Sequence, residues 1–484
     1  MTSLLVFMIN RLYSFEMLSI IPFRFLVVFF IFIVIFTLQA INNYDGETYT
    51  FLWFTISSNL LLYMGFRKNA IFFDTFLGVF LWLGFWLKTT VRVVFFDSQF
   101  SEGLAGFTIG ADVFDETLFV SGLAFFTLSF ASFIREKFIF IYSKNVKEEN
   151  ENALFLFYKD FRISILLFYI LLFMSIAVSN FYFSIYQRGE LAQTILPHWL
   201  SGIYKWLLLF GLASMAALIL SCEFKLKKKT PLFVPFLTLI EACITNISLL
   251  SRGMILNVSA LGYGMIHYFR EKNIKSNKLF WIFISISFII LFLVSVFLVN
   301  HVRKNQVNVS NYVSTINVSE SAKDIKILFL DRWVGIEGMI AVSKSEKTGW
   351  NLFNVAINEK YDESKTSFYD LNFINSPYLR TNKTLHHYIS LPGFIAFFYY
   401  ADSLIFLCSV LIVLSLFGAL IEFVTYRLGG NNLILASLIA QVVAYRYCHF
   451  GYVPAQSYLL LGAVICNILI IYYFTKLLSL WYRK

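Results

Sequence analysis

The sequence predicts an all-α, polytopic integral membrane protein with about twelve transmembrane helices and one long extracytoplasmic loop. The first reason is composition, because 58% of the 484 residues are hydrophobic and only 14% are charged. Soluble domains carry about a quarter charged residues. The second is that apolar runs of about twenty residues, the length that spans a bilayer, recur along the chain. The third is a single long polar interval, Asn300–Asp402.

The apolar runs define the expected spans in order. They are Phe23–Ile41, Tyr49–Phe66, Ala70–Leu87, Thr117–Ile134, Ile163–Phe183, Trp199–Cys222, Pro231–Leu250, Met254–Phe269, Leu279–Val299, Ser403–Phe423, Leu433–Tyr447 and Ser457–Leu478. We therefore divide the chain into an N-terminal membrane part (1–299), an extracytoplasmic loop (300–402) and a C-terminal membrane part (403–484).

The basic residues predict an orientation. Cytoplasmic loops are enriched in Lys and Arg, and one threading places every dense basic cluster on that side. These clusters are Arg67-Lys68, Arg135 to Lys137, Lys225 to Lys229, Arg270 to Lys278, Arg427 and Arg483-Lys484. Both termini are then cytoplasmic, and the long loop lies outside.

The net charge of +10 does not indicate nucleic-acid binding, because most of the Lys and Arg residues flank apolar runs. The five cysteines have neither disulfide-framework nor metal-ligand spacing. We expect no cofactor and no metal.

The long loop contains a stretch, Ser321–Asn354, whose apolar residues recur at intervals of three and four. This spacing predicts an amphipathic helix lying on the outer membrane surface.

Two arginines are candidates for binding an anion. Arg252 lies in Ser251-Arg252-Gly253, between two apolar runs, where the turn is too short to be a solvated loop. Arg332 begins a segment with two glycines that also contains Glu337. A guanidinium binds phosphate in bidentate fashion. The alternatives are that Arg252 anchors the chain to lipid headgroups and that Arg332 forms an ion pair with Asp331 or Glu337.

A second cluster precedes the return to the membrane. It contains Arg380, Lys383, His386 and His387. A histidine can act as a general base near neutral pH. Adjacent loop histidines are also common as plain surface residues, so both interpretations stay open.

Other residues carry weaker signals. Arg446 lies at the outer end of a span, as Arg252 does, whereas Arg188 and His198 fit interfacial anchors better. Glu241 lies inside a span, where a carboxylate is either functional or paired with a neighbouring helix.

The outer face thus gathers Arg252, Arg332, Arg380, Lys383 and Arg446 against the usual charge bias. This pattern predicts an anionic ligand there, and a lipid-linked diphosphate is the natural candidate.

With these features the chain resembles the bacterial O-antigen polymerase and O-antigen ligase superfamily. The resemblance covers roughly the C-terminal half. It rests on Ser251-Arg252-Gly253, on the single late loop, and on the stretch that runs from His386-His387-Tyr388 to Ala396. In the family an Asn commonly follows the His, and here that position is His387.

The resemblance implies a membrane glycosyltransferase of the bacterial inner membrane that polymerises undecaprenyl-diphosphate-linked repeat units for a lipopolysaccharide or capsule. Arg252 and Arg332, with Arg446, Arg380 and Lys383, would bind the diphosphate. His386 or His387 would be the general base, and Glu337 joins the catalytic candidates. A flippase and a chain-length regulator are the implied protein partners.

Three rival functions remain. A flippase for lipid-linked glycans would favour internal repeats and charges at mid-membrane. A transferase that uses polyprenyl-phosphate sugars would need acidic residues in its first external loop, where Asp45 and Glu47 lie. A structural subunit of an envelope complex has no specific support.

Overall fold

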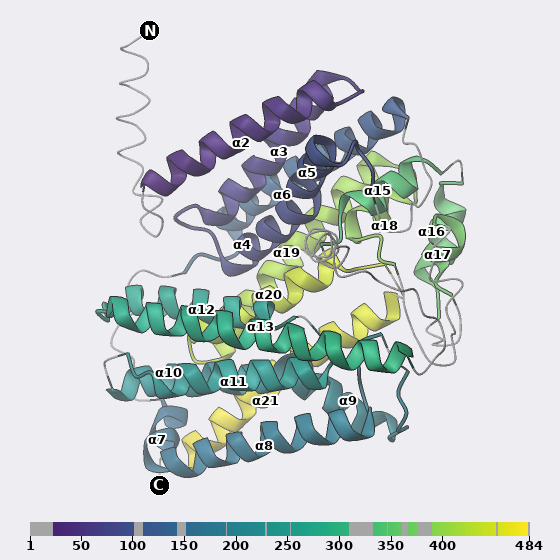
Figure 1. Ribbon diagram of the computed structural model, residues 1–484. Coiled ribbons are helices and arrows are strands. Elements are labelled where there is room, and N and C mark those ends of the chain that lie inside the picture. The colour runs from purple at the N-terminus through teal and green to yellow at the C-terminus, as the bar shows by residue number, and fades with distance from the viewer. Residues whose placement is uncertain are drawn as a thin grey trace, which may run out of the picture.

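The computed structural model describes residues 23–100, 110–142, 152–189, 191–227, 230–251, 253–308, 333–345, 347–360, 366–374, 390–451 and 454–482. Within these residues every regular element is a helix (Figure 1). The all-α prediction is therefore confirmed for the described part of the chain.

The helices follow the predicted spans closely. Their bounds are α2 Phe23–Asn43, α3 Thr48–Phe66, α4 Phe72–Leu81, π-helix η2 Trp82–Leu87, α5 Lys88–Phe95, α6 Ala111–Phe138, α7 Ala153–Asp160, α8 Arg162–Phe183, α9 His198–Trp206, π-helix η3 Leu207–Gly211, α10 Leu212–Lys227, α11 Phe233–Ser248, α12 Met254–Glu271, α13 Lys278–Asn308, α15 Ile336–Ser343, α16 Trp350–Ile357, α17 Phe368–Asn372, α18 Phe394–Tyr399, α19 Leu404–Leu428, α20 Leu433–Cys448 and α21 Pro454–Trp481.

Seven of the described helices are long and apolar enough to cross a bilayer. They cover Phe72–Phe95, Ala111–Phe138, Arg162–Phe183, Trp199–Lys227, Lys278–Arg303, Leu404–Leu428 and Ser457–Trp481. Three shorter helices, Val27–Asn43, Phe233–Ser248 and Leu433–Cys448, are also apolar. The chain is a membrane protein. Every predicted span overlaps a helix, and the count of about twelve crossings stays a prediction.

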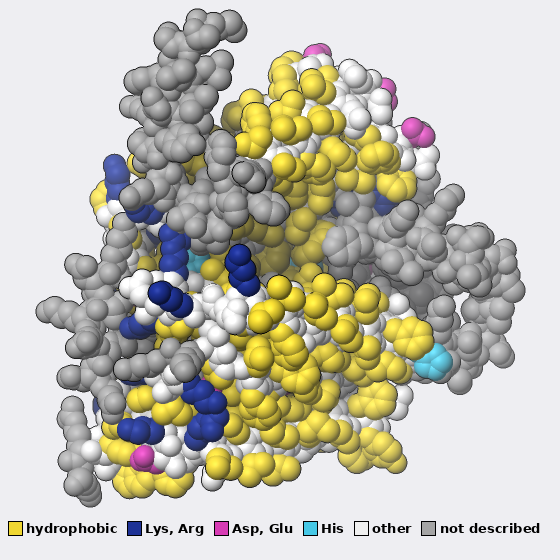
Figure 2. Space-filling model, turned by 60° about the vertical axis from the view of Figure 1, so that its left-hand side comes forward, with side chains coloured by type: hydrophobic (Ala, Val, Ile, Leu, Met, Phe, Trp, Pro, Cys, Tyr) yellow, Lys and Arg dark blue, Asp and Glu magenta, His cyan; other side chains and the backbone are white. Residues whose placement is uncertain are grey.

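The two ends of the helix bundle differ in charge. Figure 2 brings the left-hand side of Figure 1 forward, and Lys and Arg side chains gather on its left. We call this side the basic end. Its exposed basic residues are Lys68, Lys137, Lys227, Arg270, Lys272, Lys275, Lys278 and Arg427. The short helices α15 to α18 lie at the opposite end (Figure 1).

Helix α20 is the centre of the bundle. It packs against α4, α10, α12 and α19, and every residue from Leu433 to Ala444 is buried. Transmembrane helices pack most closely where their side chains are small. Here Ser437 donates a 2.7 Å hydrogen bond to the carbonyl of Ala260 on α12. The position of α20, and hence of its last turn, is thus set on all sides.

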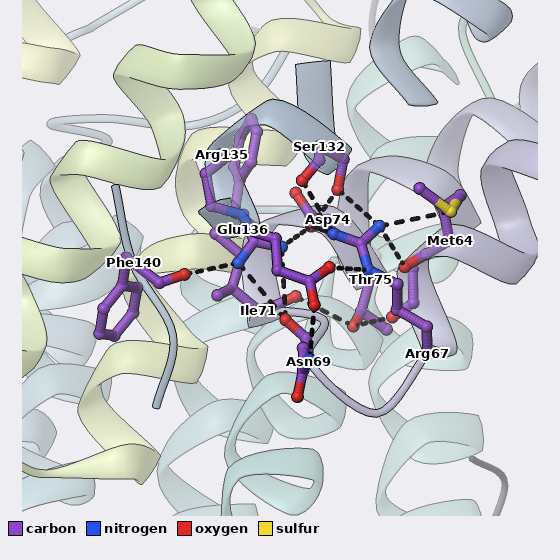
Figure 3. A network of polar contacts seen from close by, with 12 residues as sticks. Met64, Arg67, Asn69, Ile71, Asp74, Thr75, Ser132, Arg135, Glu136 and Phe140 are labelled. Atoms are coloured by element: carbon purple, nitrogen blue, oxygen red, sulfur yellow. Dashed lines mark hydrogen bonds and ion pairs between the residues drawn. The ribbon is translucent and has the colours of Figure 1, made fainter. Parts of the chain in front are cut away.

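A neutralised network of charged side chains joins α3, α4 and α6 near the basic end (Figure 3). Arg135 pairs with Asp74 at 2.7 Å, and Arg67 pairs with Glu136 at 2.9 Å. Ser132 donates a hydrogen bond to the same Asp74 carboxylate. Each buried guanidinium here has a carboxylate partner, which is the usual condition for burying charge.

The predicted amphipathic helix on the outer membrane surface is not what the structure shows. The described part of Ser321–Asn354 breaks into α15 and α16, and 309–332 lie outside the described residues. All residues from Ile336 to Val342 are buried, and they share one hydrophobic core with the long helices. The apolar spacing correctly predicted helical structure, but α15 is buried by other parts of the protein and does not lie on the membrane surface.

The end of the third predicted span is also wrong. The sequence placed it at Leu87, with Lys88 and Arg92 as flanking charges. The helix instead continues to Phe95, and the exposed fractions of Lys88 and Arg92 are 0% and 3%. Hydropathy alone ended the span there because a lysine normally marks the edge of the bilayer.

Glycines allow α15 to enter the bundle. A Cβ on Gly338 would overlap the carbonyl oxygen of Pro392, and a Cβ on Gly335 would overlap that of Gly84 in η2. Only glycine permits such a close approach of two backbones.

We predict that Gly338→Ala lowers the unfolding free energy by about 1–3 kcal/mol, because the added methyl forces α15 away from Pro392. The measurement is the thermal midpoint of the purified protein in one detergent. Gly262→Ala is the matched control: Gly262 lies inside α12, and a methyl group added there would meet no atom within 4 Å. An unchanged midpoint for Gly338→Ala would contradict the tight packing of α15.

Candidate functional site: an arginine cluster at the end of α20

The loop after α8 is tied to the end of α11 by one buried amide. The side-chain nitrogen of Asn180 donates to the carbonyls of Tyr186 and Ser248, both at 3.0 Å, and to the Ser248 hydroxyl at 2.8 Å. The Asn180 side-chain oxygen accepts from the Tyr186 backbone N–H at 2.8 Å. The side chain of Asn180 is fully buried. It therefore fixes the loop that carries Arg188.

The turn between α11 and α12 is held to the same loop. The backbone N–H of Arg188 donates to the Leu249 carbonyl at 3.0 Å. Arg303, near the end of α13, donates through Nη2 to the carbonyls of Arg188 and Leu250 at 2.9 and 2.8 Å. Leu250 has a left-handed backbone with φ 48°. The surrounding hydrogen bonds hold Leu250 in this strained backbone conformation.

Arg188 and Arg446 converge at this junction. The electrostatic surroundings of Arg446 include Arg188, and both side chains interact electrostatically with Tyr186 and Tyr445. Both arginines are partly exposed, yet Nε of Arg446 is buried without a hydrogen-bond partner. Among the described residues no carboxylate lies within ion-pair distance of either side chain. We call Arg188, Arg303 and Arg446 the arginine cluster.

Arginine stays protonated at any physiological pH, so Arg188 and Arg446 carry two like charges whose electrostatic surroundings overlap. Lys205 adds a further positive group, with Nζ 5.2 Å from the ring centroid of Tyr186. Such an arrangement is costly without a counter-charge. It is suited to a multiply charged anion, and guanidinium groups match the oxygens of phosphate.

An aromatic wall extends from the cluster. The ring of Tyr445 stacks on His449 with centroids 3.8 Å apart, and its other neighbour is Phe80 at 5.8 Å. Phe80 in turn stacks on Trp333 at 5.9 Å. Trp333 is the residue directly after Arg332 in the chain.

A third segment reaches the same end of α20. The backbone N–H of Gly393 donates to the carbonyl of Phe450 at 3.1 Å. Further back, the N–H of Ser390 donates to the buried carboxylate of Asp370 at 3.4 Å. Ser390 to Gly393 follow shortly after His386-His387 in the sequence.

Most of the predicted site residues lie outside the described residues. They are Arg252, Arg332, Arg380, Lys383, His386 and His387. Of the described residues nearest to them in the chain, Trp333 stacks on Phe80 of the aromatic wall, and Gly393 donates to Phe450 just after α20. Leu250, two residues before Arg252, is joined through Arg303 to the carbonyl of Arg188.

The two predicted site residues that the structure describes have different surroundings. Arg446 belongs to the arginine cluster. Glu337 lies away from it, in the first turn of α15, and its Oε2 pairs with Nζ of Lys88 at 2.6 Å.

Sequence reasoning missed two members of the cluster. Arg188 was assigned to interfacial anchoring, although it is a positive residue on the face where the charge bias disfavours it. Arg303 follows the predicted end of its span at Val299, and the structure continues α13 through it to Asn308. Its function as a backbone donor has no sequence signature.

The acidic residues of the first predicted external loop do not converge. Asp45 and Glu47 are exposed, and the backbone N–H of Glu47 is bound by Asp115 at 3.0 Å. No group of three His, Cys, Asp or Glu residues that could hold a metal ion occurs within the described ranges.

Comparisons of the chain with models of protein families, with curated proteins and with solved structures find no match. A function for this chain is therefore inferred from the site itself.

We predict that Asn180→Ala releases the loop that carries Arg188. The change removes several hydrogen bonds from buried groups, each worth about 1–3 kcal/mol when its partner is left unsatisfied. Trypsin cleavage after Arg188 should become faster, as measured by mass spectrometry of the purified protein. Gln193→Ala is the control, because the Gln193 side chain in the same loop is exposed. Equal cleavage rates in both variants would show that Asn180 does not hold the loop.

Proposed function

We propose that this protein is a membrane glycosyltransferase that polymerises oligosaccharide repeat units carried on a polyprenyl diphosphate. The observation that carries the proposal is that Arg188 and Arg446, which share the neighbours Tyr186 and Tyr445, have no ion-pair partner among the described carboxylates. Elsewhere in the bundle, Arg67, Arg135 and Lys88 each pair with an acid. A counter-charge supplied by the substrate explains the difference.

The charge of the two ends suggests where the reaction occurs. The basic end fits the cytoplasmic side of a bacterial inner membrane. The arginine cluster would then face outward, with the long polar interval, and both termini would be cytoplasmic. A lipid-linked glycan suits this location, because its tail stays in the bilayer while its sugars project into the outer space.

The proposed reaction is an exchange of one glycosidic bond for another. A hydroxyl of the acceptor glycan attacks the anomeric carbon of the donor, and the bond from that carbon to the diphosphate oxygen breaks. Polyprenyl diphosphate leaves with the bonding electrons, and the arginines stabilise its developing charge. The acceptor proton passes to a base, for which His386 or His387 is our candidate.

The remaining predicted residues take supporting positions in this proposal. Arg252 and Arg332 would complete the diphosphate site, because Leu250 is joined through Arg303 to Arg188 and Trp333 stacks on Phe80 of the aromatic wall. Arg380 and Lys383 would add positive charge on the same face. Glu337 is a weaker candidate for the base than the histidines, since Lys88 already occupies one of its oxygens.

We predict that Arg446→Ala and Arg188→Ala each lower polymer formation roughly a hundredfold, the typical cost of removing one donor to a developing anion. The assay is the glycan ladder of a deletion strain that expresses each variant at the wild-type level. Arg446→Lys should recover only part of the activity, because lysine keeps the charge without the bidentate geometry. Arg427→Ala is the control, an exposed arginine at the basic end.

The same strains separate the rival functions. Single-repeat glycan with exported lipid-linked units supports polymerisation. Lipid-linked units that accumulate on the cytosolic side would support a flippase instead. Activity that is lost on chelation of divalent metal would favour a transferase that uses polyprenyl-phosphate sugars. Normal ladders in both alanine variants would refute the proposed role of the cluster.

A further inference from the structure

A buried ion pair joins the short helix α15 to the long helix formed by α4, η2 and α5. Lys88 Nζ lies 2.6 Å from Glu337 Oε2, and the exposed fractions of the two side chains are 0% and 10%. Lys88 Nζ also donates to the backbone carbonyl of Trp333 at 3.2 Å. One lysine therefore holds both the start of α15 and the residue that leads into it.

A buried ion pair of this kind contributes little net stability. Taking a lysine and a carboxylate out of water costs several kcal/mol per ion, roughly what their attraction returns. Well-packed apolar residues of similar size are often as stable or more stable at such positions. The better-attested use of a buried polar pair is to specify one register among several.

The sequence of α15 shows why apolar packing alone would not fix its register against the long helices. Glu337 is the only charged residue in Ile336–Ser343, and the others are apolar or small. An apolar segment can slide or rotate against apolar helices with little loss of contact. The side chain of Glu337 restricts such movement, because any other register takes its carboxylate away from Lys88 Nζ in a low-dielectric interior.

The glycine contacts require the same register. Gly335 lies against the carbonyl of Gly84, and a shift by one residue would place Val334 or Ile336 there. No side chain fits, because even a single Cβ would overlap the Gly84 oxygen. The ion pair and the glycines thus select one docking position of α15.

We propose that Lys88 and Glu337 are a positioning pair that sets the register of α15 and so places Trp333 beside the aromatic wall of the arginine cluster. The inference rests on the proposed function for its effect on activity. Trp333 stacks on Phe80, which contacts Tyr445 next to Arg446. Neither Lys88 nor Glu337 needs to touch the substrate.

The test uses Lys88→Met/Glu337→Met, which removes both charges and retains apolar bulk. The single variant Lys88→Met leaves a lone buried carboxylate and should fold poorly. The double variant should fold with a wild-type thermal midpoint. Lys88→Arg retains the charge, and we expect it to keep more activity than the double variant.

Two readouts then separate positioning from plain stability. The first is the distance between spin labels at Phe95→Cys and Lys344→Cys, which are exposed positions at the end of α5 and just after α15. Cys466→Ser serves as the background, since Cys466 is exposed. The second is turnover with purified lipid-diphosphate glycan. We expect a broader distance distribution and at least about a tenfold loss of kcat, the scale of a small misplacement, with donor KM within about threefold.

Each other outcome counts against the inference. An unchanged distance distribution would mean that packing alone sets the register. A broadened distribution with full turnover would mean that the register of α15 does not matter for the reaction. Absence of transfer by the wild-type protein would refute the proposed function, and the label distances would still decide whether the pair sets the register.

Discussion

The end of α20 is the constraint on which the rest of the structure depends. The helix is buried along its length between α4, α10, α12 and α19, so its last turn cannot move independently of the bundle. Arg446 and Tyr445 lie on that turn. The segment at Gly393 is hydrogen-bonded to Phe450 just after this turn, and the loop after α8 is hydrogen-bonded to the end of α11. A rigid end of α20 would hold Arg446 in a fixed place, and precise positioning of reacting groups depends on such rigidity.

The arginines at the two ends of the bundle have different surroundings. Near the basic end, Arg67 and Arg135 are neutralised by Asp74 and Glu136, and the resulting network ties three helices together (Figure 3). At the opposite end the described residues provide no carboxylate for Arg188 or Arg446. In the first arrangement the attraction between opposite charges offsets much of the cost of burying them. In the second arrangement the positive charges have no acidic partner among the described residues, and this contrast is the physical basis of the proposed anion site.

Sequence alone predicted the helices well, and its candidate residues include one of the three members of the arginine cluster. Apolar runs of bilayer length locate α8 or α19 without reference to any neighbour, because the lipid imposes that length. The burial of Lys88 was not predicted, because a hydropathy profile places a lysine at the edge of the membrane. Its partner Glu337 lies far away in the sequence, so the ion pair could not be recognised. The burial of α15 and the meeting of Arg188 with Arg446 likewise depend on tertiary contacts between distant segments. Arg446 was identified because its position at the outer end of a span is itself a sequence pattern.

The proposed binding of a diphosphate by the arginine cluster can be measured directly. The measurement is the affinity of purified wild-type protein in nanodiscs for a short-chain polyprenyl diphosphate and for the matching monophosphate. Charge-assisted hydrogen bonds of about 1.5–3 kcal/mol each predict that the diphosphate binds at least about tenfold more tightly. This preference should disappear in Arg188→Ala and Arg446→Ala. Equal affinity for the two lipids, or a preference that survives both substitutions, would contradict a diphosphate site at the end of α20.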